Sequence, residues 1–236
     1  MNAFMDAADT PLRRLARVDA AAIAAGLDEE GAAVLSGMFD AAQCRSLAAL
    51  DDASGVRASF ATRPAEGRMV ALADPLPGWL VAWRSALIGM TRPIAQRWHE
   101  ALAAGDDAAT SHDADVVGMP GDAIEGSCTL LRLEQADRLS LRHGPNDDAP
   151  AHSLRVVVLL SDPGQQFTGG EFVMTEQRPR MQSRPMVLPL RQGDAAIIAC
   201  AGRPVRGARG LYRVVMKHGV SPLRTGTRWS LDIPLR

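Results

Sequence analysis

Leu154-Arg-Val-Val-Val-Leu-Leu160 is an apolar run of strand length, and similar runs surround it in the second half of the chain. Clusters of Gly, Pro, Asp and Asn separate these runs, as expected of turns between strands. Many short strands at regular spacing are typical of a β-sandwich or barrel. The other predicted strands are Cys128–Leu133, Gly170–Met174, Met186–Leu190, Ala195–Ala199, Tyr212–Lys217 and Trp229–Pro234.

The first half of the chain is rich in alanine and is predicted to be helical. Apolar residues recur at helical spacing in Pro11–Leu27, Ala41–Leu50 and Trp79–Ala104. Pro93 lies inside the third helix, so a kink or a break is expected there. Residues 105–125 are polar and are predicted to form a loop. We therefore expect an α+β protein, with a helical region at residues 1–125 packed on a β core at residues 126–236.

Composition excludes several classes of protein. The chain has 236 residues, of which 47% are hydrophobic and 22% charged, as in ordinary globular proteins. It has no run of about 18 uncharged apolar residues, so no membrane span is predicted. A net charge of -1 gives no basic field for a long nucleic acid. Cys44, Cys128 and Cys200 are widely spaced, and no secretory signal is found at the N-terminus, so we expect a cytoplasmic protein without disulfides.

Two histidines stand at the ends of predicted strands. His143 follows the segment Arg132–Arg142, and His218 ends the strand that begins at Tyr212. Arg228 stands ten residues beyond His218, in the next strand. Two imidazoles from separate strands can hold a non-haem iron ion, and a guanidinium can bind both oxygens of a carboxylate. By spacing alone, the same pattern also fits two histidines and an arginine with no shared function.

Longer motifs make the prediction specific. They include Phe167-Thr-Gly-Gly-Glu-Phe172, Thr175-Glu-Gln-Arg-Pro-Arg-Met-Gln-Ser-Arg184, Leu190-Arg-Gln-Gly-Asp194 and Lys217-His-Gly-Val-Ser221. With them, residues 128–233 resemble the bacterial iron(II)/2-oxoglutarate oxygenases of the Oxygenase-NA family, relatives of AlkB-type nucleic-acid dealkylases. The resemblance implies a double-stranded β-helix (jelly-roll) core that uses Fe(II), 2-oxoglutarate and O2. It implies His143 and His218 as catalytic iron ligands. It also implies Arg228, with Arg224 as a lesser candidate, as the group that binds 2-oxoglutarate.

The chain departs from the family's iron triad, which is His-x-Asp followed later by a second His. Pro145 stands two residues after His143, where the family has aspartate. The strand Leu139–Leu141 also allows a register shifted by one residue, in which Gly144 takes the place of the aspartate. Neither register has an acid at the expected position. A site without that carboxylate has room for a chloride ion beside Gly144 or Pro145.

Three functions are therefore predicted. The main one is a halogenase, as in superfamily members that lack the aspartate, with chloride as co-substrate at an aliphatic carbon of a nucleotide- or nucleoside-like molecule. The second is a hydroxylase or oxidative dealkylase, in which Asp147 or Asp148 completes the iron site. The third is a catalytically dead β-helix that only binds a ligand.

The resemblance points to a nucleobase- or nucleotide-like substrate, and the near-neutral charge favours a small molecule over a long nucleic acid. Arginines near the motifs are candidates for binding its phosphate, although an ordinary ion pair is the alternative for each. They are Arg132, Arg138, Arg142, Arg178, Arg180 and Arg184. Thr175–Arg184 is predicted to form a loop over the mouth of the site.

Overall fold

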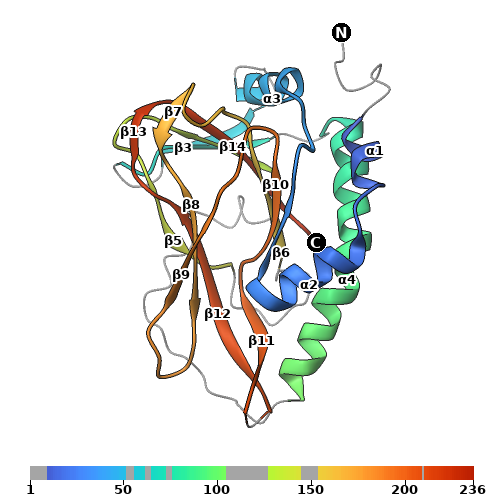
Figure 1. Ribbon diagram of the computed structural model, residues 1–236. Helices are drawn as coiled ribbons and strands as arrows, with labels where there is room; N and C mark the ends of the chain where they lie inside the picture. The colour runs from blue at the N-terminus through green and yellow to red at the C-terminus, as the bar shows by residue number, and fades with distance from the viewer. Residues whose placement is uncertain are drawn as a thin grey trace.

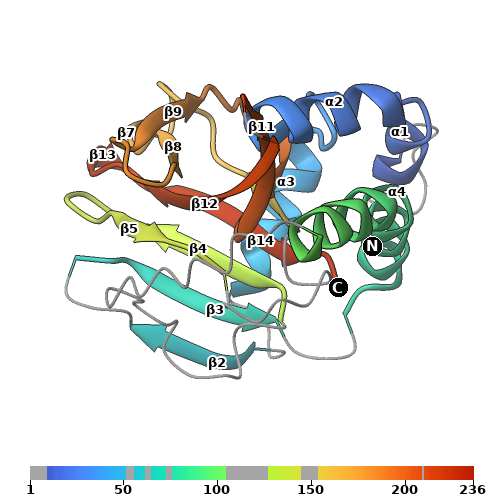
Figure 2. The same ribbon diagram turned by 90° about the horizontal axis from the view of Figure 1, so that it is seen from below.

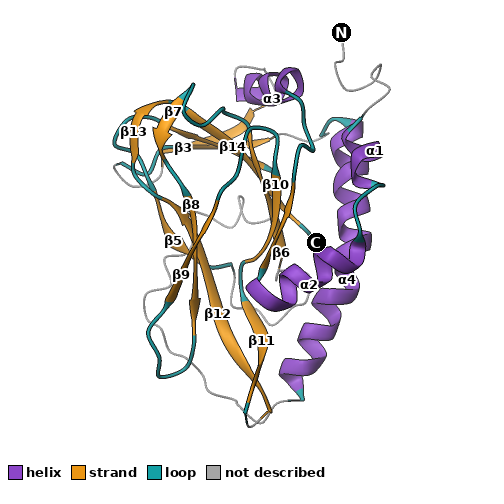
Figure 3. Cartoon of the chain, in the orientation of Figure 1, coloured by secondary structure: helices purple, strands orange, loops and turns teal. Residues whose placement is uncertain are grey.

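The structure is a computed structural model, and it describes residues 10–51, 56–61, 65–72, 76–104, 127–144, 154–208 and 210–236. The helices of these residues lie in the first half of the chain; α1, α2 and α4 gather on one side of the strands, and α3 lies above one end of them (Figure 3). They are α1 (Pro11–Leu15), α2 (Ala20–Glu30), α3 (Ala41–Ala48), the 3-10 turn η1 (Ala49–Asp51) and α4 (Gly78–Ala103).

The strands of the described residues pair in an antiparallel manner throughout. In chain order they are β1 (Ala32–Leu35), β2 (Val56–Ala61), β3 (Arg68–Leu72), β4 (Thr129–Leu133), β5 (Leu139–Arg142), β6 (Leu154–Leu159), β7 (Phe167–Gly169), β8 (Phe172–Gln177), β9 (Arg184–Leu188), β10 (Ala195–Ala199), β11 (Gly202–Gly207), β12 (Gly210–Val220), β13 (Leu223–Gly226) and β14 (Arg228–Pro234).

These strands form two layers that face each other (Figure 1). The larger sheet has the order β1-β10-β6-β14-β4-β3-β2, and the second has the order β11-β12-β8-β9, with β5 also paired to β12. Strands β7 and β13 form a separate pair. The α+β class predicted from the sequence is therefore confirmed.

The core lies between the two sheets and under the helices. Every residue of β6 and of β10 is buried, which explains why both strands are apolar in sequence apart from Arg155 of β6. Helices α1, α2 and α4 lie together beside the larger sheet (Figure 2). Helix α4 buries Trp83 and Trp98 on its inner side.

The helices begin and end where the sequence provides caps. The Asp19 carboxylate accepts a hydrogen bond from the first turn of α2, and Gly31 ends that helix with a φ of 72°. Asp40 and Gln43 form a capping box at the start of α3. The predicted helix Pro11–Leu27 is thus divided into α1 and α2, with Asp19 as the N-cap of the second.

The other helices agree with their predicted ranges. Helix α4 runs through Pro93 without the predicted break. No helix of the described residues is both long and apolar enough to span a membrane. The predicted loop at residues 105–125 lies outside the described residues.

All seven predicted strands are confirmed, with small shifts of their ends. Strands β1, β2 and β3 were not predicted, and they bring the first half of the chain into the larger sheet. Because β1 pairs with β10 and β3 pairs with β4, the first half is not purely a helical support.

Candidate functional site

The inner face of β14 carries a row of buried polar side chains. Arg228, Ser230 and Asp232 occupy alternate positions of this strand, so they point to the same side of the sheet. Leu231 and Ile233 alternate with them and are buried on the other side. The row places a cation at one end and a carboxylate at the other end of the same interior surface.

Arg228 is a buried cation without a counter-ion among the described residues. Its side chain is 1% exposed, and its Nη1 donates a hydrogen bond to Ser230 Oγ over 3.0 Å. Its Nε has no hydrogen-bond partner. Burial alone lowers the pKa of Arg228 to about 10, and no neighbouring carboxylate counteracts this. Leaving such a charge buried and unpaired is costly, so an anionic ligand would stabilise it.

A cavity of about 710 Å³ lies against Arg228. Phe167 of β7, Phe172 of β8 and Leu188 of β9 give it a largely apolar wall. The guanidinium carbon of Arg228 lies 6.0 Å from the centre of the Phe167 ring. Gly170 also lines the cavity, and a Cβ at that position would lie 3.1 Å from Arg228 Cδ. The missing side chain of Gly170 therefore leaves room for the arginine.

His218 of β12 lies further along the interior and is 3% exposed. Neither of its ring nitrogens has a hydrogen-bond partner among the described residues. The ring stacks on Phe172, with 6.1 Å between the ring centres. Burial, assisted by the charge of Arg142, lowers the pKa of His218 to about 3, so the imidazole is neutral at physiological pH.

Arg142 faces His218 directly. The two residues are partners in the β5–β12 ladder, so their side chains lie on the same face of the sheet. Asp232 approaches them from β14: its Oδ2 lies 3.6 Å from Arg142 Nη2, and its Oδ1 lies 2.7 Å from Arg155 Nε. Burial acts to raise the pKa of Asp232, but the charges of Arg155 and Arg142 hold that pKa below its usual value.

The predicted first iron ligand stands next to Arg142 in the chain and lies near enough to His218 for its charge to contribute to the lowered pKa of that imidazole. His143 follows β5 and is half-buried, with its Nδ1 2.6 Å from the carbonyl oxygen of Gly144. The N–H of Gly144 donates to the carbonyl of Cys200. A small void of about 10 Å³ in the interior is lined by Arg142, His218 and Asp232, and His143 does not line it.

The other predicted site residues lie elsewhere. Arg224 is exposed on β13, outside the wall of the Arg228 cavity. Arg132 Nη2 lies 2.6 Å from Glu134 Oε1, and the guanidinium carbon of Arg132 lies 5.5 Å from the centre of the Trp229 ring. Pro145, Asp147 and Asp148 lie outside the described residues.

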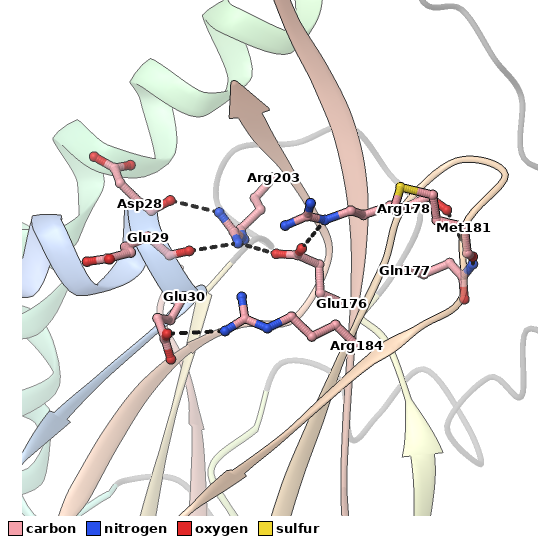
Figure 4. Close-up of polar contacts among 9 residues, drawn as sticks. All are labelled: Asp28, Glu29, Glu30, Glu176, Gln177, Arg178, Met181, Arg184 and Arg203. Atoms are coloured by element: carbon pink, nitrogen blue, oxygen red, sulfur yellow. Dashed lines mark hydrogen bonds and ion pairs between the residues drawn. The ribbon is translucent and has the colours of Figure 1, made fainter. Parts of the chain in front are cut away.

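Two of the three arginines of the Thr175–Arg184 segment are engaged in ion pairs. Arg178 Nε lies 2.6 Å from Glu176 Oε1, and Arg184 Nη2 lies 3.4 Å from Glu30 Oε1 (Figure 4). Arg180 is exposed in the turn between β8 and β9. The segment is therefore a hairpin whose strands belong to the second sheet, and none of its residues lines the Arg228 cavity, contrary to the predicted loop over the site.

Comparison with solved structures defines the class of fold. A prolyl-4-hydroxylase of Pseudomonas putida superimposes with a TM-score of 0.55 and 13% identity over 91% of this chain and 96% of that one. A prolyl 4-hydroxylase of Phytophthora capsici gives a TM-score of 0.57 and 14% identity over 97% and 66% of the two chains. The fold is thus the double-stranded β-helix of 2-oxoglutarate/iron(II) oxygenases, as predicted.

Sequence comparison identifies the family. Residues 67–236 match the Oxygenase-NA family model, described as an oxygenase catalysing oxidative methylation of damaged DNA. The uncharacterized proteins Rv2227 and MT2286 from two strains of Mycobacterium tuberculosis are each 33% identical to this chain over 168 residues, which is 67% of this chain and 68% of the relative. The chain belongs to the Oxygenase-NA family.

Iron(II) and 2-oxoglutarate are typical of this class, and the described residues fit the two differently. A carboxylate of 2-oxoglutarate fits Arg228 and Ser230, because the guanidinium is buried without an acidic partner. An iron ion needs about three ligands such as two imidazoles and a carboxylate around one point. The described residues contain no such group of three. His218 is available as a ligand, but Asp232 is held by two arginines, so these residues do not fit the ion.

Sequence reasoning missed Arg155, Ser230 and Asp232, and it considered Arg142 only as a candidate for binding a substrate phosphate. Ser230 and Asp232 could have been found from β14, since they follow Arg228 at the strand period of two. Arg142 stands two residues before Gly144, so the shifted register already placed it where the family has its first histidine. Arg155 could have been noticed as the one charged residue in the apolar strand β6, but its partner Asp232 is distant in the sequence and is brought beside it only by the pairing of β6 with β14.

Proposed function

We propose that this protein uses its oxygenase fold to bind 2-oxoglutarate, with Arg228 and Ser230 holding one carboxylate. The observation that carries this proposal is the burial of Arg228 without an acidic partner in the described part of the chain. A guanidinium can donate two parallel hydrogen bonds to a carboxylate, and such charge-assisted bonds are strong. The ligand would supply the counter-charge that the protein itself does not provide.

The neighbouring cavity supports a small dicarboxylate as the ligand. Its apolar wall suits the methylene groups of 2-oxoglutarate, and its volume of about 710 Å³ leaves space for a second molecule beside it. Ser230 fixes the orientation of the guanidinium by accepting a hydrogen bond from Nη1. The arginine is thereby held in place before a ligand arrives.

Among the predicted reactions, the family description favours oxidation over chlorination. It supports the hydroxylase or oxidative dealkylase, with damaged DNA rather than a free nucleotide as the substrate. Nothing in the described residues or the comparisons supports a halide site. Oxidation requires iron, which the described residues do not fit. Binding of the dicarboxylate is therefore the function that the geometry supports best.

Isothermal titration with 2-oxoglutarate tests this proposal. Changing Arg228→Met should weaken binding by about 30-fold or more, because truncating one partner of a buried charged pair costs at least about 2 kcal/mol. Arg224→Met is the matched control. Arg224 is exposed on β13, the strand that precedes β14 in the chain. Its substitution should change the affinity by no more than about twofold, since exposed charges contribute little.

Two results would contradict the proposal. One is wild-type protein that shows no binding at millimolar 2-oxoglutarate. The other is an Arg228→Met variant that is folded, as judged by circular dichroism, and binds as tightly as the wild type. Glutarate, which has the same two carboxylates but lacks the 2-oxo group, should compete more weakly than 2-oxoglutarate if the 2-oxo end of the ligand is also recognised.

A further inference from the structure

The cavity beside Arg228 is lined by a second arginine. Arg191 stands between β9 and β10 in the chain and lines the same space of about 710 Å³. Among the described residues, these two are the only arginines or lysines that line it. Arg228 is 1% exposed, whereas Arg191 is an exposed residue. One guanidinium therefore belongs to the floor of the cavity and the other to its rim.

Hydrogen bonds of its turn hold the backbone of Arg191 in place. The N–H of Arg191 donates to Asp194 Oδ2 over 2.9 Å, and the other oxygen of that carboxylate accepts from the N–H of Gly37 at 2.8 Å. The N–H of Gly193 donates to the carbonyl oxygen of Leu159, which also lines the cavity. Because the backbone is fixed, only the side chain of Arg191 has to be ordered when a ligand binds.

The guanidinium of Arg191 has no ion pair or hydrogen bond in the described part of the chain; only its backbone N–H is engaged. Other arginines of the same region differ in this respect. Arg178, Arg184 and Arg203 each pair with a carboxylate of the protein. Arg191 is thus free to bind an anionic group from outside.

Two acidic residues at the rim also affect an anionic ligand. The Glu171 carboxylate accepts a hydrogen bond from Ser221 Oγ, and the charge of Arg224 acts on it as well. Asp162 lines the cavity and has no ion pair among the described residues. Its charge opposes an anion at the rim, so its removal should strengthen the binding of that anion.

We infer that Arg191 binds the second carboxylate of the ligand whose first carboxylate lies on Arg228 and Ser230. This inference rests on the proposed function, because it requires a dicarboxylate in this cavity. Two guanidinium groups match the two charges of such a ligand, and the apolar wall at Phe167 and Leu188 suits its methylene groups. A monocarboxylate would leave Arg191 unused. Arg191 therefore determines the preference for dicarboxylates.

A comparison of 2-oxoglutarate with 2-oxopentanoate tests the inference, since the second compound has a methyl group in place of the distal carboxylate. In isothermal titration, the wild type should bind 2-oxoglutarate at least about fivefold more tightly. Arg191→Met should lose about fivefold for 2-oxoglutarate, as expected of a charge pair near water, and less than about twofold for 2-oxopentanoate. Arg228→Met should weaken the binding of both.

Three further measurements separate a direct contact from a general effect. Arg206→Met is the matched control, because Arg206 is exposed on β11 and does not line the cavity; it should change neither affinity by more than about twofold. Asp162→Asn should strengthen 2-oxoglutarate binding by about twofold. In about 1 M sodium chloride, the difference between wild type and Arg191→Met should shrink to less than about twofold, because salt screens exposed charges.

The inference fails if Arg191→Met, folded as judged by circular dichroism, binds 2-oxoglutarate as tightly as the wild type. It also fails if this variant loses the same factor for 2-oxopentanoate. In both cases the proposed function stands as long as Arg228→Met weakens 2-oxoglutarate binding. A wild type that binds neither compound would instead overturn the proposed function, and the role of Arg191 with it.

Discussion

The imidazole of His218 is buried without a hydrogen-bond partner in the described part of the chain, and this has a cost that depends on pH. Its pKa is about 3 in the folded protein, against an ordinary value of 6.5, mainly because of burial. Below pH 6.5 the unfolded chain takes up a proton that the folded chain refuses. Stability must therefore fall as the pH drops from 6.5 toward 3, by up to about 1.4 kcal/mol per pH unit.

Replacing His218→Leu should remove this dependence. Relative to the wild type, the variant should gain about 2 kcal/mol in the free energy of unfolding between about pH 7.5 and pH 5, because leucine takes up no proton. Urea denaturation of both proteins at the two pH values measures the difference. A difference that is the same at both pH values would show that His218 is protonated in the folded state, and the description of its environment would be wrong.

At the scale of elements, one buried ion-pair network joins α2 to the second sheet (Figure 4). Arg203 of β11 is 1% exposed and pairs with Glu176 of β8, which also pairs with Arg178. The same guanidinium donates to the carbonyl oxygens of Asp28 and Glu29 at the end of α2. Arg203 therefore binds the last carbonyls of a helix and the carboxylate of a strand at once.

The Arg203→Met change should destabilise the protein by about 3–5 kcal/mol, because it leaves the Glu176 carboxylate buried with one partner fewer. The double change Arg203→Met with Glu176→Leu should cost clearly less, since no buried charge is then stranded. Arg184→Met is the control: its pair with Glu30 is half-exposed on both sides, so its loss should cost less than about 1 kcal/mol. Urea unfolding of the wild type and the three variants measures these differences. Equal losses in the free energy of unfolding for Arg203→Met and Arg184→Met would contradict the prediction.

These ion pairs also explain why two of the predicted substrate arginines, Arg178 and Arg184, could not be assigned from the sequence. A polar segment rich in arginine, such as Thr175–Arg184, looks the same whether it meets a phosphate or a carboxylate of its own chain. Glu30 is distant from Arg184 in the sequence, and Glu176 is one residue of the same polar motif as Arg178. Both ion pairs are therefore visible only in the structure. The fold positions these side chains for stability.

For the molecule as a whole, the elements that could be predicted are those whose burial requires a recognisable pattern of apolar residues within the element itself. Strands β6 and β10 are buried on both faces, and their sequences are apolar except for Arg155 of β6, so they were found. Strand β13 was missed because three of its four residues are exposed and polar or glycine. Strand β1 has only four residues, too few for an alternating pattern to be read.

The same distinction applies to the interior site. Arg228 was predicted because its place in a family motif is local to the sequence. The Arg142–Asp232 pair was not, because it exists only where β5 and β14 meet across the interior. A prediction based on a sequence motif can therefore find Arg228, whereas the ion pair of two distant strands becomes visible only in the folded chain.

A last prediction concerns the whole molecule: whether the second half of the chain, after residue 125, can fold without the first half. Strands from the first half form both ends of the larger sheet: β1 on one side, and β3 with β2 on the other. Residues 127–236 alone would expose the paired edges of β10 and β4, as well as apolar surface now covered by α4. Unpaired edges of this kind promote aggregation.

We therefore expect the fragment 127–236 to show no cooperative unfolding in urea and to aggregate when expressed by itself. Co-expression with residues 1–126 should restore a complex that unfolds cooperatively, because the missing edge strands and α4 return with that piece. Circular dichroism and size-exclusion chromatography of the two preparations measure this. A fragment 127–236 that is monomeric and unfolds cooperatively alone would mean that the β core is an independent domain and that β1 and β3 are additions to it.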